Sequence, residues 1–410
     1  MNTSAEVLDS PVLPKSPRRA PKLREASFRD HAQIAALESK YGLLSKGYDE
    51  WSHLWLGNPV YRKLGGSWSI GWVLEDERHQ IVGSMGNIPL LYELQGNTIL
   101  AASGRHWVVE PQYRSFSLEI LERVVYQHHI QLYINNTASA EAQGPLRFLC
   151  HRVPLGTWDE SAFWITNYRG FLQSFLLSKG YSVAKPLCRP LSAALFLKDL
   201  FSRKDLRGSD VEVKTCSGFD ERFEDFWGEL KSGKSHLLLA VRTREMLEWH
   251  YKYALLNGRL WILTVVNGKR LVAYATFERR DNPKIGLKRM SLVDFQSLEG
   301  DTALLVPLLS WAAKKCRDEG IHVLESIGRW LERGELLRRI APYRHKLPSW
   351  CYFYRANDPN LAESLRERCA WSPSLFDGDA SLCAGYMIPS SSRPASDATL
   401  WPTPTRPKLG

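Results

Sequence analysis

The sequence predicts an α+β fold in which one unit of strands and helices occurs twice along the chain. In each half, two strand-like runs joined by a polar turn precede a third strand, a polar loop and a helical pattern. Equivalent points keep similar offsets, 190 residues from Ile81 to Leu271 and 185 residues from Val108 to Val293. Unrelated segments would not keep so even a spacing, and we therefore interpret the halves as a tandem duplication.

The elements expected in the two units follow the same order. A Glu-Trp pair opens each unit, at Glu50-Trp51 and at Glu248-Trp249, with further aromatic residues at Trp55 and Tyr253. We favour core packing for these rings, and a hydrophobic wall of a binding site is the alternative. The strands and single helix expected next cover 68–74, 81–88, 106–109, 118–125 and 131–134 in the first unit, and 260–266, 271–277, 289–293, 304–312 and 322–324 in the second.

The two ends of the chain differ in composition from the body. Residues 1–21 are rich in Pro, Ser and Arg without an apolar period, and predict a disordered basic tail. Residues 386–410 predict a disordered Pro/Ser-rich tail. The charged, weakly patterned stretch 198–207 places the expected boundary, which gives an N-terminal domain 22–203 and a C-terminal domain 204–385.

Composition narrows the class of protein. The 410 residues are 44% hydrophobic and 24% charged, which excludes a fully disordered chain, a collagen and a coiled-coil rod. No apolar run approaches the ~20 residues that a membrane helix needs, so we expect no membrane insertion. The net charge of +10 favours anionic ligands but does not indicate which kind of anionic ligand binds. The seven cysteines form no C-x-x-C pair and there is no secretory signal, so we expect a cytoplasmic protein with reduced thiols and no metal.

Short motifs of the first unit resemble the GNAT superfamily of acyl-CoA-dependent N-acyltransferases. The segments 23–26 and 30–37 resemble the family's first strand and helix, and Ile81-Val-Gly83 resembles the strand before its central one. The run Val108-Val-Glu-Pro-Gln-Tyr-Arg114 resembles the central strand and the start of the pyrophosphate loop.

The second unit resembles a more degenerate copy of the same family. Its end, Trp371-Ser-Pro-Ser followed by Asp377-Gly-Asp379, resembles the close of bacterial tandem-GNAT proteins, some of them akin to Fem-type peptidyl transferases. The resemblance covers residues 22–385. It implies two tandem GNAT-like domains, each a twisted mixed sheet flanked by helices.

The resemblance also implies that acetyl-CoA or another acyl-CoA binds the first unit as a co-substrate. Two central strands separate after a bulge and leave backbone groups free for the pantetheine arm, while the next loop and helix N-terminus face the pyrophosphate. The family pattern has glycines where Ser117 and Glu119 stand, so this loop keeps its basic residue but gains an acid. The cofactor-binding residues implied are Val108, Val109, Arg114, Ser115, Phe116 and Ser117.

Catalysis of amide formation needs a base for the attacking amine. Family members often use a Glu near the central strand, and here Glu110 follows that strand while His106 lies on it. Strand alternation predicts both side chains on one face. A solvated loop acid and a half-buried strand residue are the structural alternatives for these two. The family's usual acid, a Tyr after Asn135-Asn136, is missing until Tyr168, so the thiolate would leave without it.

Three other patterns carry expectations. The second unit's loop, Gln296–Asp301, holds Glu299 and Asp301 without a basic residue, so we expect it to repel a pyrophosphate and bind no cofactor.

The run Gly228–Ser235 matches the Walker A pattern, but a helical pattern precedes it and a strand pattern follows, so a polar helix-to-strand turn is favoured. The basic stretch 329–346 is a solvated face or, alternatively, an anion-binding edge.

These observations predict an N-acyltransferase that moves an acyl group, with acetyl preferred, to an amine on a small molecule or peptide. The acceptor would sit between the two copies, and the charge would suit an anionic one. A catalytically inactive GNAT-like binding protein for an anionic ligand or partner is the first alternative. A Fem-like aminoacyl transferase that uses tRNA is the second and less favoured one. The acceptor, the acyl-chain length, the oligomeric state and the pathway stay open.

Overall fold

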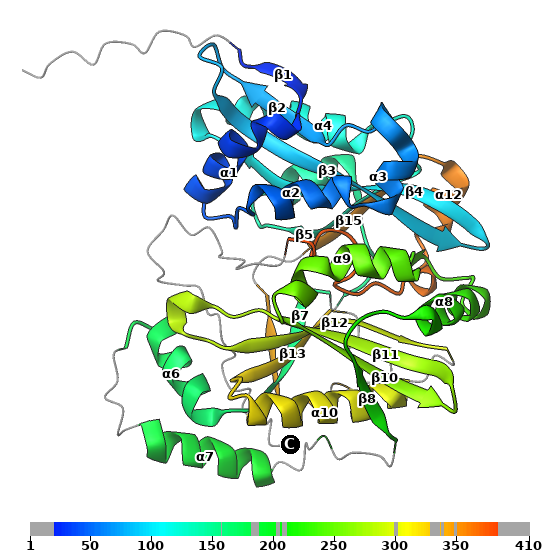
Figure 1. Ribbon diagram of the computed structural model, residues 1–410. Helices are drawn as coiled ribbons and strands as arrows, with labels where there is room; N and C mark the ends of the chain where they lie inside the picture. The colour runs from blue at the N-terminus through cyan, green and yellow to red at the C-terminus, as the bar shows by residue number, and fades with distance from the viewer. Residues whose placement is uncertain are drawn as a thin grey trace, which may run out of the picture.

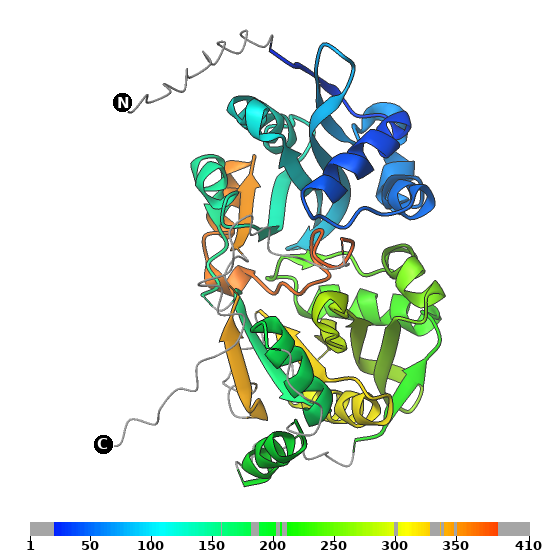
Figure 2. The same cartoon turned by 90° about the vertical axis from the view of Figure 1, so that its left-hand side faces the viewer.

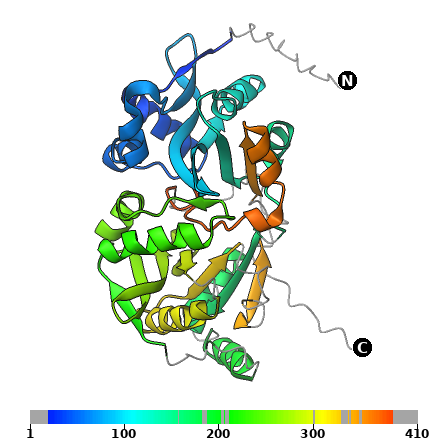
Figure 3. The ribbon, with the colours of Figure 1, turned by 90° about the vertical axis from the view of Figure 1, so that its right-hand side faces the viewer.

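The computed structural model describes residues 20–156, 158–181, 188–201, 206, 211–298, 302–328, 337, 340–347 and 351–383. In these ranges the chain forms two mixed β-sheets, each flanked by helices and lying one above the other (Figure 1). Side views show the last described segment of the chain running between the two bodies (Figures 2 and 3), and its residues 371–382 are buried.

The first sheet has the strand order β1-β2-β3-β4-β5-β15-β6, and the short β9 pairs with β3. Neighbouring strands are antiparallel except for the parallel pair β4 and β5. The strands are β1 (Lys22–Glu25), β2 (Gly71–Glu75), β3 (Ile81–Leu94), β4 (Asn97–Val109), β5 (Leu132–Ala138), β6 (His151–Arg152), β9 (Leu239–Ala240) and β15 (Cys351–Ala356).

The second sheet has the order β14-β7-β13-β12-β11-β10-β8. Its only parallel pair among the described strands is β12 and β13, so the pattern of pairings matches the first sheet strand for strand. The strands are β7 (Glu160–Ile165), β8 (Val213–Cys216), β10 (Leu260–Asn267), β11 (Arg270–Arg279), β12 (Arg289–Ser297), β13 (Val323–Ile327) and β14 (Tyr343–Lys346).

Two strands cross between the sheets in opposite directions. Strand β7 follows β5 in the chain but pairs with β13, and β15 follows β13 but pairs with β5. Each sheet is therefore completed by a strand from the other half of the sequence. The expected domain boundary near residue 203 remains a prediction. No single point in the sequence separates the strands of one sheet from those of the other, because β7 and β15 are exchanged.

Helices form where apolar residues repeat at helical spacing and a polar side chain caps the first turn. In α4, Ile120, Leu121, Val124 and Val125 are all buried against the first sheet. The Thr243 hydroxyl caps α9 by accepting the Met246 N–H. The helices are α1 (His31–Lys40), α2 (Tyr48–Leu56), α3 (Pro59–Leu64), α4 (Ser117–Val125), α5 (Gln143–Leu149), α6 (Tyr168–Ser178), α7 (Cys188–Phe201), α8 (Glu221–Gly233), α9 (Arg244–Leu256), α10 (Leu305–Asp318) and α12 (Pro359–Ser364).

The structure confirms the predicted fold class and the strand and helix expected at each matched point of the two units. Trp51, Trp55 and Trp249 are buried, as core packing of the repeated aromatic segment predicts, whereas Tyr253 is only half-buried. All seven cysteines are free thiols. Within the described part of the chain, no helix has both the length and the apolar character to cross a membrane.

Candidate functional site

The central strands of the first sheet separate halfway along their length. Strands β4 and β5 are paired only between Ala101–Ser103 and Leu132–Ile134. Beyond this point β4 bulges against β3, because His106 and Trp107 together oppose a single residue, Met85. His106 has a positive φ of 46°, which marks the bulge. The separation leaves one edge of the end of β4 without a strand partner among the described residues.

A buried charged cluster lies at this bulge. The Arg105 guanidinium donates to Glu38 of α1 at 2.6 Å, and His106 Nδ1 lies 3.0 Å from the same Glu38 oxygen. Burial alone would raise the pKa of Glu38, but the Arg105 charge and the His106 contact lower it to about 2. Burial, reinforced by the Arg105 charge, lowers the pKa of His106. The imidazole is therefore neutral at neutral pH and can accept a proton.

Several buried polar atoms beside the bulge have no hydrogen-bond partner among the described residues. They include the hydroxyls of Ser84 and Ser103 and the Nε of Arg105. Gly104 lies between two of them, and a Cβ at this position would come within 2.4 Å of Met85 Cε and 2.8 Å of the Tyr133 hydroxyl. Unsatisfied buried groups are costly, so such a cluster is suited to a polar ligand.

The expected cofactor residues lie at the open end of β4. Val108 and Val109 pair with β3 on one side only, and the chain then forms a 3₁₀ turn, Pro111–Phe116, that leads into α4. Arg114 and Ser115 are exposed, while Phe116 and Ser117 are half-buried. The Ser117 hydroxyl donates to the Arg114 carbonyl at 2.7 Å. The 3₁₀ turn thus presents an arginine beside the N-terminus of α4, with Glu119 exposed in the first turn of that helix.

Glu110 lies in a different environment from His106, although both side chains contact α1. Its carboxylate forms an ion pair with Lys40 at 2.5 Å and accepts a hydrogen bond from Gln112. Its backbone N–H donates to the Val82 carbonyl, which fixes the end of the strand. A base role for Glu110 would require the Lys40 pair to open.

The segment Trp371–Cys383, here called the strap, runs between the two sheets and is visible in orange and red in Figure 1. Residues 371–382 are all buried. Near the first sheet, Asn136 donates to the Asp377 carbonyl and Thr137 donates to the Asp379 carboxylate at 3.2 Å. Burial raises the pKa of Asp379 to about 6. The strap thus brings a second titratable carboxyl to the end of β5.

The same strap closes the corresponding point of the second sheet. There β12 bulges at Val293 and separates from β13 after Leu292. At this bulge Val293 is not paired with a residue of a neighbouring strand, and its carbonyl accepts a hydrogen bond from the Leu375 N–H at 3.0 Å. Beside it, Arg242 pairs with Asp294 at 2.8 Å, both fully buried. The expected loop carboxylates Glu299 and Asp301 lie outside the described residues.

The strap also contacts α9. His250 Nε2 lies 2.5 Å from the Ser381 hydroxyl, and the His250 ring stacks on Phe376 at 4.2 Å between centroids. Burial lowers the pKa of His250 to about 3. A cavity of about 30 Å³ adjoins this pair and is lined by residues of α2, α9 and the strap. Sequence reasoning did not select His250, Ser381, Glu38 or Arg105, because their chemistry depends on neighbours distant in the chain.

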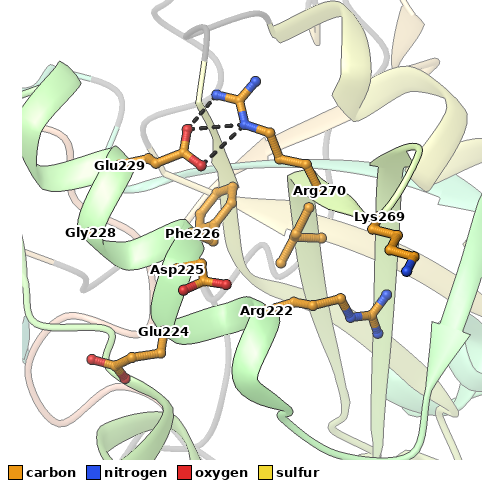
Figure 4. A pocket seen from close by; sticks show the side chains of 9 residues that line it. Arg222, Glu224, Asp225, Phe226, Gly228, Glu229, Lys269 and Arg270 are labelled. Carbon is orange, nitrogen blue, oxygen red and sulfur yellow. Dashed lines mark hydrogen bonds and ion pairs between the residues drawn. The ribbon is translucent and has the colours of Figure 1, made fainter.

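The Walker-like run does not form a phosphate loop. Gly228–Gly233 lies within α8, so the expected helix-to-strand turn begins only at Lys234, which donates to the Ser297 carbonyl at the end of β12. An open groove of about 650 Å³ lies beside this helix, between α8 and the β10–β11 turn (Figure 4). Its charges are mixed, and Arg270 is held by an ion pair to Glu229. Most of the basic stretch 329–346 lies outside the described residues, and its final part is strand β14.

Comparisons with known proteins identify the fold. No protein-family model and no curated protein sequence matches this chain. A structure of Saccharomyces cerevisiae N-myristoyltransferase with bound myristoyl-CoA and inhibitors matches with a TM-score of 0.52 at 10% identity, covering 85% of this chain and 83% of that one. Two further structures of that enzyme with myristoyl-CoA match with TM-scores of 0.50 at 12% and 11% identity, covering 86% and 87% of this chain and 86% and 88% of theirs. The chain therefore shares the fold of these N-myristoyltransferase structures.

Proposed function

We propose that this protein transfers an acyl group from acyl-CoA to an amine. The observation that carries the proposal is the separation of β4 from β5 at a bulge that is lined by unpartnered buried polar atoms. The fold supports the same class of reaction. We also propose that the two units arose by duplication, which the matched strand orders of the sheets support.

The residues of the first unit fit an acyl-CoA. The unpaired edge of Val108 and Val109 would bind the amides of the pantetheine arm. The exposed Arg114 and the backbone of Ser115–Ser117 would bind the pyrophosphate at the N-terminus of α4. The thioester carbon would then lie near the bulge.

His106 is the base that this geometry favours. It lies at the bulge and is neutral at neutral pH, and Glu38 would stabilise the imidazolium that forms. The amine nitrogen attacks the thioester carbonyl and forms the C–N bond, the C–S bond breaks, and His106 takes the proton of the amine. The CoA thiolate leaves and takes a proton from water. Glu110 is the second candidate base, once its Lys40 pair opens.

The acceptor would approach between the two units, where the strap lies. This side of the first sheet carries Arg105, and Lys46 lies nearby on the chain before α2, but Arg105 is paired with Glu38 and Lys46 with Glu50. The charge that favours an acceptor with a negative group, either a small molecule or a peptide, is therefore the net +10 of the whole chain. We propose acetyl as the acyl group, and a longer acyl chain is the alternative.

Release of free CoA thiol tests the activity. The full chain is incubated with acetyl-CoA or a long-chain acyl-CoA and a panel of amines and peptides, and the thiol is measured with a chromogenic disulfide. We expect release that depends on both substrates. Acyl-CoA binding without turnover on any amine would favour the binding-protein alternative. Retention of aminoacyl-tRNA that weakens with salt, without acyl-CoA binding, would favour the Fem-like alternative.

A further inference from the structure

Helix α7 presents apolar side chains to solvent. It lies at the outer end of the second body, packed against α6 on one side (Figures 1 and 3). Phe201 is 79% exposed, Leu200 62% and Leu197 48%, and the small residues Ala193 and Ala194 are exposed as well. A surface helix of a globular protein normally turns its apolar stripe inward. In α7 much of the apolar surface faces out.

Polar residues hold the inner side of α7. The Asp199 carboxylate accepts hydrogen bonds from the Tyr168 hydroxyl at 2.8 Å and the Tyr343 hydroxyl at 2.7 Å. Cys188 is buried at the start of the helix, and Ser192 lies on the same side. These hydrogen bonds to α6 and β14 fix the orientation of α7 about its axis. Because Asp199 faces inward, Leu197 and Phe201 face outward.

Basic residues border the exposed apolar face. At about 100° per residue, Leu197 and Phe201 lie near the middle of the outer face, while Arg189 and Lys198 lie near its two borders. The half-exposed Phe196 and Leu191 lie at similar angles to these two basic residues, and the Lys198 ammonium is 5.4 Å from the centre of the Tyr343 ring. In the described part of the α6–α7 hairpin there are four basic residues and one acid, and that acid is the inward Asp199. Long basic side chains beside an apolar stripe are typical of helices that lie in a lipid interface.

We propose that α7 docks this protein on an anionic membrane surface. Leu197, Leu200 and Phe201 enter the boundary between head groups and acyl chains, and Arg189 and Lys198 contact the lipid phosphates and carboxylates. Crossing a bilayer takes ~20 residues, and α7 has 14, so the helix lies along the surface. The proposal does not depend on the acyl-transfer reaction.

Vesicle flotation of the full-length protein tests this inference. We expect binding to vesicles of phosphatidylcholine with phosphatidylserine, and much weaker binding to phosphatidylcholine alone. The double change Leu197→Glu/Phe201→Glu should lower the bound fraction at least ~10-fold, and Arg189→Glu/Lys198→Glu should remove the preference for the acidic lipid. Circular dichroism and the melting temperature check that each variant is folded.

Phe148 provides a matched control. It is also a phenylalanine with 79% exposure, but it lies at the end of α5 in the other body. Phe148→Glu should leave vesicle binding unchanged. Absence of binding by the wild type, or equal losses from Phe148→Glu and the α7 variant, would overturn the proposal. So would a concentration-dependent dimer that Phe201→Glu dissolves, because the face would then belong to a second copy.

Discussion

His53 and Trp249 hydrogen-bond to each other's backbone across the junction of the two units. The Trp249 indole N–H donates to the His53 carbonyl at 3.0 Å, and His53 Nε2 donates to the Trp249 carbonyl at 3.1 Å. These residues belong to α2 and α9, which occupy equivalent places before the first long hairpin of each unit. The junction is therefore fixed by directed polar bonds as well as by apolar packing.

Replacing Trp249 with phenylalanine tests this junction. The change deletes the indole N–H and leaves a half-buried carbonyl without its donor, so we expect the free energy of unfolding to fall by about 1–2 kcal/mol. Urea denaturation of the full chain measures it. Trp107→Phe is the control, because the Trp107 indole has no hydrogen-bond partner among the described residues. Equal losses in the two variants would mean that the hydrogen bond contributes nothing.

His250 should make the stability depend on pH. Its folded-state pKa of about 3 is below the unfolded value of 6.5, so the unfolded chain binds a proton first as the pH falls. The contribution of His250 is complete above pH 6.5 and is lost on acidification, by about 2 kcal/mol at pH 5. The His250→Gln variant should therefore lose less stability than the wild type between pH 7 and pH 5. Parallel losses in urea midpoints would contradict this.

The sequence predicted the strands and helices well because alternation and helical spacing are local properties. The segments 81–88 and 271–277 form β3 and β11, and 118–125 forms α4. The exchange of β7 and β15 was not predictable in the same way. A buried strand has the same pattern in either sheet, and only the distant partners decide where it pairs.

The site was predictable only in part. The order of strand, arginine and helix indicated the turn at Arg114, which the structure forms at the end of β4. The bulge at His106 has no local sequence signal, and it determines that Arg105 and His106 both reach Glu38. The motif Asp377-Gly-Asp379 was visible, but its position between the sheets depends on contacts more than 80 residues away in the chain, including Asn136 and Val293.

His106 and Glu110 can be separated by the pH dependence of the rate. We expect His106→Asn to lower kcat by roughly 10²- to 10⁴-fold and to remove the acidic limb of the profile, whose midpoint should lie below 6.5 because burial lowers the pKa of His106. Glu110→Gln should keep that limb. The reverse pattern, with the limb lost only in the Glu110 variant, would assign the base to Glu110.

Arg114 should contribute to acyl-CoA affinity. A charge-assisted bond at an exposed position is worth about 1.4 kcal/mol, so Arg114→Ala should raise the calorimetric Kd roughly tenfold. Arg123→Ala is the matched control, since Arg123 is also exposed but lies at the other end of α4. Glu119→Gly should not weaken binding. Unchanged affinity in Arg114→Ala, or a large loss in Glu119→Gly, would show that the pyrophosphate lies elsewhere.

The second unit should bind no acyl-CoA, so the whole chain should bind one. The pantetheine arm would need the backbone of the β12 bulge, but there the Val293 carbonyl already accepts the Leu375 N–H, and the strap around it is buried. A carboxylate ~5 Å from a phosphate would add about 3 kcal/mol of repulsion if Glu299 faced the ligand.

Titration calorimetry should give one acyl-CoA site per chain, and Arg114→Ala should weaken binding at this site without changing the number of sites. A photoreactive acyl-CoA should label 107–119 and not 293–298. Two sites per chain, or labelling at Val293, would mean that the strap opens and that both units bind the co-substrate.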